Sequence, residues 1–308
     1  MPTDSQSTSP ISVVAVSGAT GLIGSALVER LRASGARVRR LVRPGHAGGD
    51  DVEWDPMRGA LAPHALDGVD AVVHLAGEPL AQRWTSEKKT AIRESRVRGT
   101  ELLARTIAAM DRTPRVLLSG SAVGYYGDRG DETLDETSAP GTDFLSRVAR
   151  EWEEATRSAS DAGVRVVLLR TGVVLSPKGG ALAKLLPVFR LGAGGPIGSG
   201  RQWMSWISLD DHVRAMEHAL ATEGLSGPVN LVAPNPMRNA EFAATLGSVL
   251  TRPAIVPVPS FALELLYGEM ARATILSGQR VLPKALVRSG FEHSHPTLEQ
   301  ALRFELDG

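Results

Sequence analysis

Three glycines near the start of the chain constrain its fold more than any other feature. Residues 11–16 form an apolar, β-branched run; Gly18, Gly21 and Gly24 follow at intervals of three, and leucine and valine then recur at helical spacing. This order predicts a buried strand, a tight turn and the start of a helix. The first glycine permits the turn, the second lets a ligand approach the backbone, and the third lets the helix pack closely. Because such a turn directs free N–H groups and a helix dipole at one point, the sequence predicts a site for the pyrophosphate of a dinucleotide.

The next predicted strand, residues 36–42, bears on which dinucleotide fits. NAD sites usually carry an aspartate or glutamate about twenty residues after the glycines, where it binds the ribose 2′-hydroxyl. This chain has Arg39, Arg40 and Arg43 there and no acid. A guanidinium can bind a 2′-phosphate through two hydrogen bonds, whereas a carboxylate would repel it. We therefore expect NADP as the cofactor, with Arg43 as its first contact and Arg40 as a second candidate.

The composition excludes several classes of function. The 308 residues carry 34 basic and 34 acidic side chains, so the formal net charge is zero and a general nucleic-acid-binding protein is not expected. The absence of cysteine excludes disulfides and thiolate chemistry. No apolar run is long enough to span a membrane, and residues 1–10 are polar, without the apolar core of a signal peptide. We expect a cytoplasmic protein with a disordered tail at residues 1–10.

Strands and helices alternate beyond the first motif. Buried strands are predicted at residues 69–75, 115–119 and 164–170, separated by helices at residues 86–110 and 143–162. This alternation is typical of the α/β class, with a doubly wound parallel sheet and crossover helices. Ligands of such sheets bind outside the carboxyl ends of the strands. One cleft is therefore expected to be lined by the segments that follow these strands: Gly77, residues 119–126 and residues 171–175.

The alternation weakens after Pro177, which indicates a second, smaller lobe. Residues 11–232 are expected to form the dinucleotide-binding domain, with residues 178–206 contributing to a substrate lobe. Residues 233–308 are expected to form the C-terminal segment of that lobe, with helical patterns at residues 239–250 and 261–277.

Charged and aromatic side chains before this segment are candidates for substrate binding. Lys184 and Arg201 flank a glycine-rich loop, and they form either an anion clamp for a substrate phosphate or solvated surface charges. Trp206 lies with Trp203 in a short predicted strand, residues 203–207. It is a candidate for stacking on a base or sugar, and the alternative is a place in the core.

Three other polar features favour structural interpretations. The acidic residues 128–136 are predicted to form a solvated loop. His293 and His295 precede a proline in a predicted surface turn, and no further histidine or cysteine clusters with them, so no metal site is expected. His74 lies inside a predicted strand and is interpreted as a core histidine with its polar atoms satisfied.

Beyond the first motif, several short blocks resemble the extended short-chain dehydrogenase/reductase superfamily. The likeness is greatest to an atypical branch of nucleotide-sugar-epimerase-like proteins with a C-terminal DUF1731 segment. The resemblance covers nearly the whole chain after Pro10 and implies a Rossmann domain, an NADP-type cofactor and a small substrate lobe, without defining a substrate. The blocks that carry it are GATGLIG from Gly18, HLAGEP from His74, SGSAVGYYG from Ser119, DFL from Asp143, REWE from Arg150, LRTGVVL from Leu169, GSG from Gly198, SWI from Ser205, APNP from Ala233 and GQRVLP from Gly278.

The resemblance implies specific cofactor contacts. Arg43 falls on the position that binds the 2′-phosphate, and Asp55 falls near the adenine amino group. The residues of the phosphate turn are Gly18, Thr20, Gly21, Leu22, Ile23 and Gly24. The loop that passes the ribose contains Leu75, Ala76 and Gly77.

The catalytic pattern of the superfamily is incomplete in this chain. Dehydrogenases of this type use a serine and a Tyr-x-x-x-Lys pair, in which the tyrosine transfers the proton and the lysine lowers the pKa of the tyrosine and holds the ribose. Ser121 matches the serine and is expected to donate a hydrogen bond to the substrate oxygen. Phe144 and Val148 occupy the tyrosine and lysine positions, and neither can transfer a proton.

Two interpretations of this difference remain open. In the first, another group supplies the proton: Tyr125 is the nearest phenol along with Tyr126, Glu78 is a carboxylate expected near the substrate, and Arg147 partly replaces the charge of the lysine. The chain is then an oxidoreductase or epimerase that acts on a small molecule such as a nucleotide sugar. In the second, the chain binds NADP as a non-catalytic sensor. The superfamily often dimerises through two helices, which here are those predicted from Ser86 and Asp143.

Overall fold

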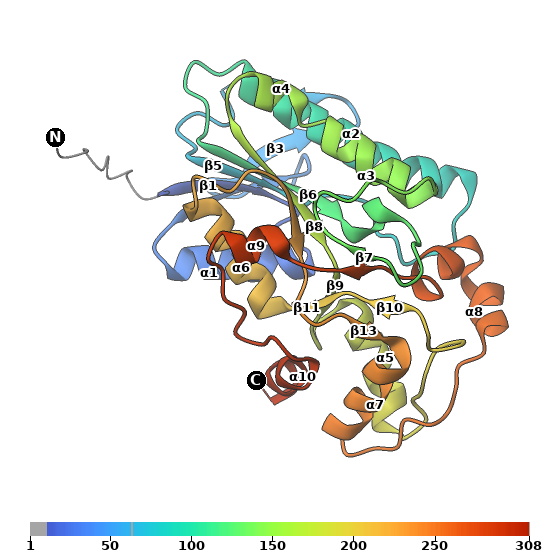
Figure 1. The fold of residues 1–308 in the computed structure, drawn as a ribbon. Coiled ribbons are helices and arrows are strands. Elements are labelled where there is room, and N and C mark those ends of the chain that lie inside the picture. Colours follow the sequence, from blue (N-terminus) through green and yellow to red (C-terminus); the bar gives the residue numbers. More distant parts are fainter. Residues whose placement is uncertain (1–10, 63, 308) are drawn as a thin grey trace.

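The computed structural model describes residues 11–62 and 64–307, so the expected disordered tail lies outside the described part of the chain. Eight strands form one central sheet. They are β1 (Val13–Ser17), β2 (Arg37–Val42), β3 (Val52–Asp55), β4 (Ala60–Leu61), β5 (Ala71–His74), β6 (Val116–Ala122), β8 (Arg165–Thr171) and β12 (Gly227–Leu231). Their order is β12-β8-β6-β5-β1-β2-β3-β4, and every neighbouring pair is parallel except β3 and β4 at one edge (Figure 1). The prediction of an α/β, doubly wound parallel sheet is confirmed.

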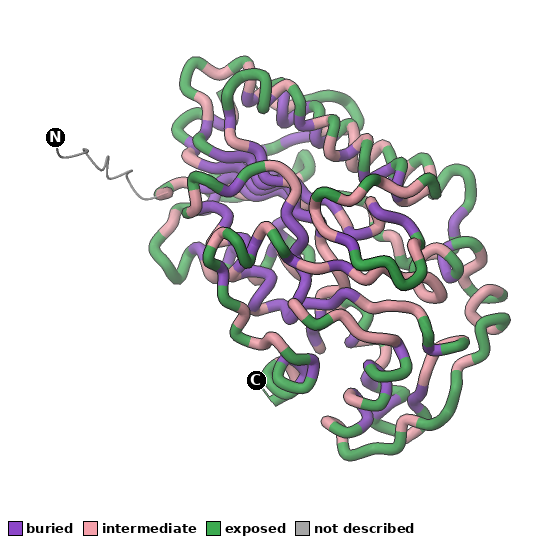
Figure 2. The backbone as a smooth tube through the Cα atoms, viewed as in Figure 1, coloured by how far each residue is buried: buried purple, intermediate pink, exposed green. Residues whose placement is uncertain are grey.

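Helices cover both faces of this sheet. They are α1 (Leu22–Ala33), α2 (Ser86–Ala108), α3 (Phe144–Glu154), α4 (Arg157–Asp161), α6 (Leu209–Ala221) and α9 (Lys284–Arg288). Side chains of α1, α6 and α9 join one face in a buried cluster, and those of α2 and α4 join the other, with α3 beside α2 (Figure 1). Figure 2 shows that the buried backbone is concentrated in the sheet and the helix faces turned toward it. Because both faces are covered, the central strands are continuous apolar runs, as parallel strands require.

The remaining elements form a smaller lobe beyond the carboxyl ends of the strands. They are η1 (Val123–Tyr126), β7 (Thr133–Leu134), β9 (Val173–Leu175), α5 (Gly180–Arg190), β10 (Trp203–Met204), β11 (Trp206–Ser208), β13 (Met237–Arg238), α7 (Asn239–Val249), α8 (Ser260–Tyr267), η2 (Ala271–Ile275), β14 (Arg280–Val281) and α10 (Leu298–Asp307). Helices α5, α7 and α10 share one buried apolar cluster. No helix of the described residues combines the length and apolarity needed to cross a membrane.

Three predictions for this lobe are wrong. The strand predicted at residues 203–207 is two strands: β10 pairs with β13 in antiparallel fashion, and β11 pairs with β9 in parallel. Trp206 does not line a cleft, because its side chain is fully buried in the cluster of α5, α7 and α10 and its indole N–H donates to the carbonyl oxygen of Asn235 (3.1 Å). The acidic residues 128–136 are not a simple solvated loop, since β7 lies within them, pairs with β14 and buries Leu134.

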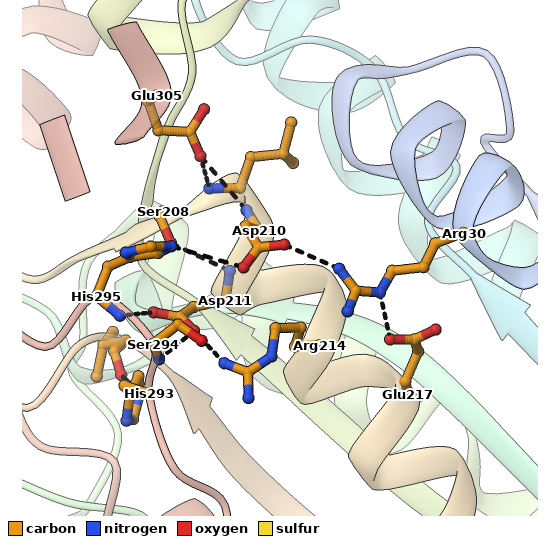
Figure 3. Close-up of polar contacts among 12 residues, drawn as sticks. Arg30, Ser208, Asp210, Asp211, Arg214, Glu217, His293, Ser294, His295 and Glu305 are labelled. Atoms are coloured by element: carbon orange, nitrogen blue, oxygen red, sulfur yellow. Dashed lines mark hydrogen bonds and ion pairs between the residues drawn. The ribbon is translucent and has the colours of Figure 1, made fainter. Parts of the chain in front are cut away.

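The C-terminal segment is attached to the first turn of α6 (Figure 3). The Asp211 carboxylate is almost fully buried and accepts hydrogen bonds from the backbone N–H groups of Ser294 (2.8 Å) and His295 (2.9 Å) and from Arg214 Nη1 (2.7 Å). Glu305 of α10 accepts the first N–H of α6 (2.8 Å). The histidine segment at 293–295 is therefore a turn held by a carboxylate. Within the described residues, no group of three or more His, Asp or Glu side chains is placed to hold a metal ion.

Arg30 extends this connection to α1. Its guanidinium lies between two carboxylates of α6, Asp210 (2.8 Å) and Glu217 (2.6 Å) (Figure 3). The helix that follows the glycine turn is thus joined through α6 to the C-terminal segment.

Candidate functional site

The glycine turn has the geometry that its spacing predicts. Gly18 has φ +69°, and a Cβ there would lie 2.8 Å from the backbone carbon of Leu75. A Cβ on Gly24 would lie 2.2 Å from the carbonyl oxygen of Gly18. Side chains at these positions would therefore push the turn away from β5 and push α1 away from the turn.

The N-terminus of α1 is free to bind an anion. Gly21 is the N-cap, no side chain of residues 11–62 or 64–307 caps the helix, and the first turn holds no acidic residue. The N–H groups of Leu22, Ile23 and Gly24 belong to the first turn of the helix, where no intrahelical acceptor exists. These donors and the helix dipole suit a phosphate group. Thr20 is exposed beside them.

The arginines of β2 and of the residue after it divide into engaged and free side chains. Arg37 binds Asp50 through two hydrogen bonds, and Arg39 donates to the carbonyl oxygen of Asp67. Arg40 binds Asp51 through two hydrogen bonds (2.8 and 2.5 Å), which lower the pKa of that carboxyl. Arg43 is exposed, and its guanidinium has no hydrogen-bond or ion-pair partner among residues 11–62 and 64–307. Arg40 is therefore engaged elsewhere, and Arg43 is the guanidinium left for a ligand.

The loop after β5 is fixed to the turn by Ser17 and His74. Ser17 Oγ accepts the N–H groups of Leu75 (3.1 Å) and Ala76 (3.3 Å), so its own proton is donated to His74 Nδ1 (2.6 Å). The proton of the imidazole is then on Nε2, which has no partner within the described residues, so the interpretation of His74 as fully satisfied is wrong. Burial lowers the pKa of His74 to about 3, which keeps the ring neutral.

Asp55 has a local role in the structure. Its Oδ1 accepts the N–H groups of Met57 (3.1 Å) and Arg58 (3.2 Å) and so closes the turn between β3 and β4. The implied contact of Asp55 with adenine stays a prediction.

Ser121 belongs to a buried polar network that the sequence analysis missed. Its hydroxyl donates to Glu153 Oε1 (2.6 Å), and Glu153 binds Arg170 through two hydrogen bonds (2.8 and 2.9 Å). The Arg170 and Glu153 side chains are only 3 % and 9 % exposed. Contrary to expectation, the Ser121 hydroxyl in this structure therefore does not point its proton toward a substrate, because it donates that proton to Glu153.

The two adjacent tyrosines of η1 have different surroundings. Tyr126 is fully buried, donates to Asn230 Oδ1 (2.7 Å) and accepts from Arg170 Nη1 (3.0 Å), and burial raises its pKa to about 12. Tyr125 is partly exposed and lies under the Arg170 guanidinium, 3.5 Å from the ring centre. Its hydroxyl has no partner among the described residues. Tyr125 is therefore the phenol of the pair that remains available for proton transfer.

Apolar packing fills the positions of the missing tyrosine and lysine. Phe144 lies edge-on to Trp84 (5.3 Å), and the ammonium of Lys89 lies 4.6 Å from the centre of its ring. Val148 is buried on the inner face of α3. Arg147, the expected partial replacement for the lysine, is exposed and donates to the carbonyl oxygen of Thr142 (2.6 Å).

A cluster of arginines surrounds Trp203 in the smaller lobe. The guanidiniums of Arg238 and Arg280 lie 4.3 and 4.7 Å from the centres of the Trp203 rings, and the indole N–H donates to Asp131 (2.8 Å). Arg238 also donates to Asp131 and to the carbonyl oxygen of Arg201. Trp203, Arg201, Arg238, Arg280 and Asp131 are hereafter called the Trp203 cluster. Two of its guanidiniums lie over the indole, and one of these also donates to the Asp131 carboxylate.

Two predicted substrate residues lie apart from this cluster. Lys184 is exposed on α5 and makes no polar contact with the described residues. Glu78 accepts from Gln82 Nε2 (3.2 Å) and lies 3.6 Å from Lys88 Nζ, close to the loop after β5.

The parallel sheet and the uncapped glycine turn define a nucleotide-binding Rossmann protein. Residues 14–232 match the NAD dependent epimerase/dehydratase family and residues 258–305 match a domain of unknown function, DUF1731. The chain belongs to this epimerase/dehydratase family, and the resemblance to the extended short-chain dehydrogenases is confirmed.

Relatives match along almost the whole chain. An epimerase family protein of Mycobacterium bovis is 48 % identical over 95 % of this chain and 97 % of its own length. The crystal structure of the human epimerase family protein SDR39U1 with NADPH superposes with a TM-score of 0.89 at 36 % identity and covers 96 % of this chain and 99 % of the human one. A nucleoside-diphosphate sugar epimerase from Corynebacterium glutamicum is 40 % identical with a TM-score of 0.80, over 97 % of this chain and 58 % of that one.

Proposed function

We propose that this protein binds NADP(H) at the glycine turn, with Arg43 as the residue that selects the 2′-phosphate. The observation that carries the proposal is the contrast along β2, where Arg37, Arg39 and Arg40 are engaged and Arg43 is free. The NADPH in the structure of the human relative supports the same cofactor.

Isothermal titration calorimetry tests this proposal. An Arg43→Met substitution removes a charge-assisted contact, so the Kd for NADPH should rise about 10- to 100-fold while the Kd for NADH stays unchanged. Arg37→Met is the matched control, because Arg37 is also exposed on β2 but is paired with Asp50, and it should leave both constants unchanged. Equal weakening of NADPH and NADH by Arg43→Met would refute the assignment.

We further propose that the protein is an oxidoreductase or epimerase acting on an anionic sugar or nucleotide-sugar-like substrate. Bound NADP(H) would supply or accept the hydride. Tyr125, with its free hydroxyl beneath Arg170, is the candidate for moving the proton. The Trp203 cluster is the candidate for holding the anionic part of the substrate, with Arg201 and Arg280 free of carboxylate partners within the described residues.

A second function, a non-catalytic NADP(H) sensor, is favoured by two observations at the expected catalytic positions. Phe144 and Val148 are packed in apolar surroundings at the positions of the tyrosine and lysine, and Ser121 is bound to Glu153. NADPH oxidation against a panel of carbonyl compounds and nucleotide sugars separates the two. Turnover that Tyr125→Phe abolishes supports the enzyme, whereas NADPH binding without turnover on any panel member supports the sensor.

A further inference from the structure

Arg96 is a partly buried cation that the functions proposed above do not use. It lies on α2 and reaches beneath the loop after β5, where Nη1 donates to the carbonyl oxygens of Glu78 and Ile92 (3.0 Å each). A Cβ on Gly77 would lie only 3.2 Å from the centre of the guanidinium. The glycine therefore lets Arg96 approach the backbone of this loop closely.

No carboxylate neutralises this guanidinium by a hydrogen bond. Nε and Nη2 have no acceptor in the described part of the chain, and the nearby Glu78 carboxylate is hydrogen-bonded to Gln82. Burial lowers the pKa of Arg96 to about 10, partly offset by the charge of Glu78, so the side chain stays cationic at neutral pH. Arg170, which is more deeply buried than Arg96, has Glu153 as a full partner. The free N–H groups of Arg96 are therefore available to a further acceptor, such as an oxygen atom of a ligand.

The position of Arg96 relates it to the missing lysine. The guanidinium lies 5.1 Å from the centre of the Trp152 ring, and Trp152 follows Val148 by one turn on the same buried face of α3. Val148 holds the lysine position of the superfamily. The positive charge beside this face of α3 is therefore supplied by Arg96 of α2, because Val148 of α3 is apolar.

We propose that Arg96 is a cofactor-binding residue that takes over the positioning role of the absent lysine and holds the nicotinamide half of NADP(H) from beneath the loop after β5. This inference rests on the proposed binding of NADP(H). A guanidinium does not titrate at neutral pH, so Arg96 positions the cofactor and takes no part in proton transfer. That division of roles fits this site, because residue 144 is a phenylalanine and has no proton whose pKa a neighbouring lysine would lower.

Calorimetry with two ligands tests the assignment on the full chain. NADPH contains both halves of the cofactor, whereas adenosine 2′,5′-bisphosphate contains the 2′-phosphate but lacks the nicotinamide half. Arg96→Gln retains an N–H donor for the loop carbonyls without the charge. It should raise the Kd for NADPH about tenfold or more and leave the Kd for the bisphosphate unchanged. Arg96→Lys restores the charge and should bind NADPH more tightly than Arg96→Gln. Arg43→Met should raise the Kd of both ligands.

The control is Arg93→Met, one turn earlier on α2. Arg93 is exposed and paired with Glu151, so its loss should change neither the Kd for NADPH nor the Kd for the bisphosphate. A readout independent of any variant's folding is the Arg96 Nε–H resonance in arginine-labelled unmodified protein, which should shift with NADPH and not with the bisphosphate.

Three results overturn the inference. They are an unchanged Kd for NADPH in Arg96→Gln, an equal rise in the Kd of both ligands in that variant, and an Arg96 Nε–H resonance that does not shift when NADPH is added. Failure of the proposed function gives a different result, in which the unmodified protein binds neither NADPH nor the bisphosphate.

Discussion

The glycine turn follows β1 and the inner face of α3 packs at β6, two strands away in the sheet, and the two regions are built in different ways. The turn consists of backbone: Gly18, Gly21 and Gly24 determine it within seven consecutive residues. The face of α3 is built from side chains of several elements, with Glu153 bound to Arg170 of β8 and Trp152 beneath Arg96 of α2. The comparison teaches that a binding feature made of backbone tolerates little change, whereas a site made of side chains can be rebuilt with different residues.

The largest effect is expected from breaking the side-chain network of α3. Glu153→Gln leaves the Arg170 guanidinium buried without a charged partner, so the free energy of unfolding should fall on the order of 3–5 kcal/mol. Urea unfolding at pH 7 measures it. The matched control is Glu154→Gln, because Glu154 pairs with Arg157 on the surface and its loss should cost less than about 1 kcal/mol. Similar small losses in both variants would show that the buried pair does not hold this region together.

A smaller loss of stability, with a complete loss of cofactor binding, is expected from Gly24→Ala. The new Cβ would lie 2.2 Å from the Gly18 carbonyl oxygen, and the resulting shift of α1 should lower the free energy of unfolding by about 1–3 kcal/mol. NADPH binding should disappear from calorimetry because the donors of the turn move with the helix. Gly48→Ala, which meets open space, should change neither quantity. NADPH binding of normal strength in Gly24→Ala would mean that the turn is not the phosphate site.

The pH dependence of stability sharpens the comparison at His74, which links β5 to the turn. Burial lowers its pKa from 6.5 to about 3, so between these values the unfolded chain takes up a proton and the native chain does not. The contribution of His74 is thus complete above pH 6.5 and is lost as the pH falls toward 3, at a rate of roughly 1 kcal/mol per pH unit. His74→Asn should show a shallower decline between pH 7 and 5 in urea unfolding. His46→Asn, at an exposed position, should retain the slope of the unmodified protein.

Sequence reasoning predicted the parts of the molecule whose cause is local. The glycine spacing, the strand before it and the helix after it lie within about twenty residues, and the doubly wound sheet follows from the alternation of elements. Arg43 was predicted as the first contact for a similar reason, since its position is counted directly from the glycines. That Arg40 is not available to help Arg43 follows only from its contact with Asp51.

The rest depended on contacts between distant segments. Nothing in the sequence near Glu153 or Arg170 indicates that the two side chains pair and that Glu153 also binds Ser121. In the sequence, Arg96 is not distinguished from the other charged residues of its helix. Trp203 and Trp206 lie in one apolar run, and only the different partner strands of β10 and β11 separate a tryptophan among arginines from one in the core.

The attachment of the C-terminal turn to Asp211 has a consequence for how the protein as a whole responds to damage. Asp211 and the Arg30 partners Asp210 and Glu217 stand on the same helix, α6, so residues 294–295 and α1 are both anchored to it. We therefore expect damage at residues 294–295 or at Glu305 to disturb α1 through α6, without any contact with the glycine turn.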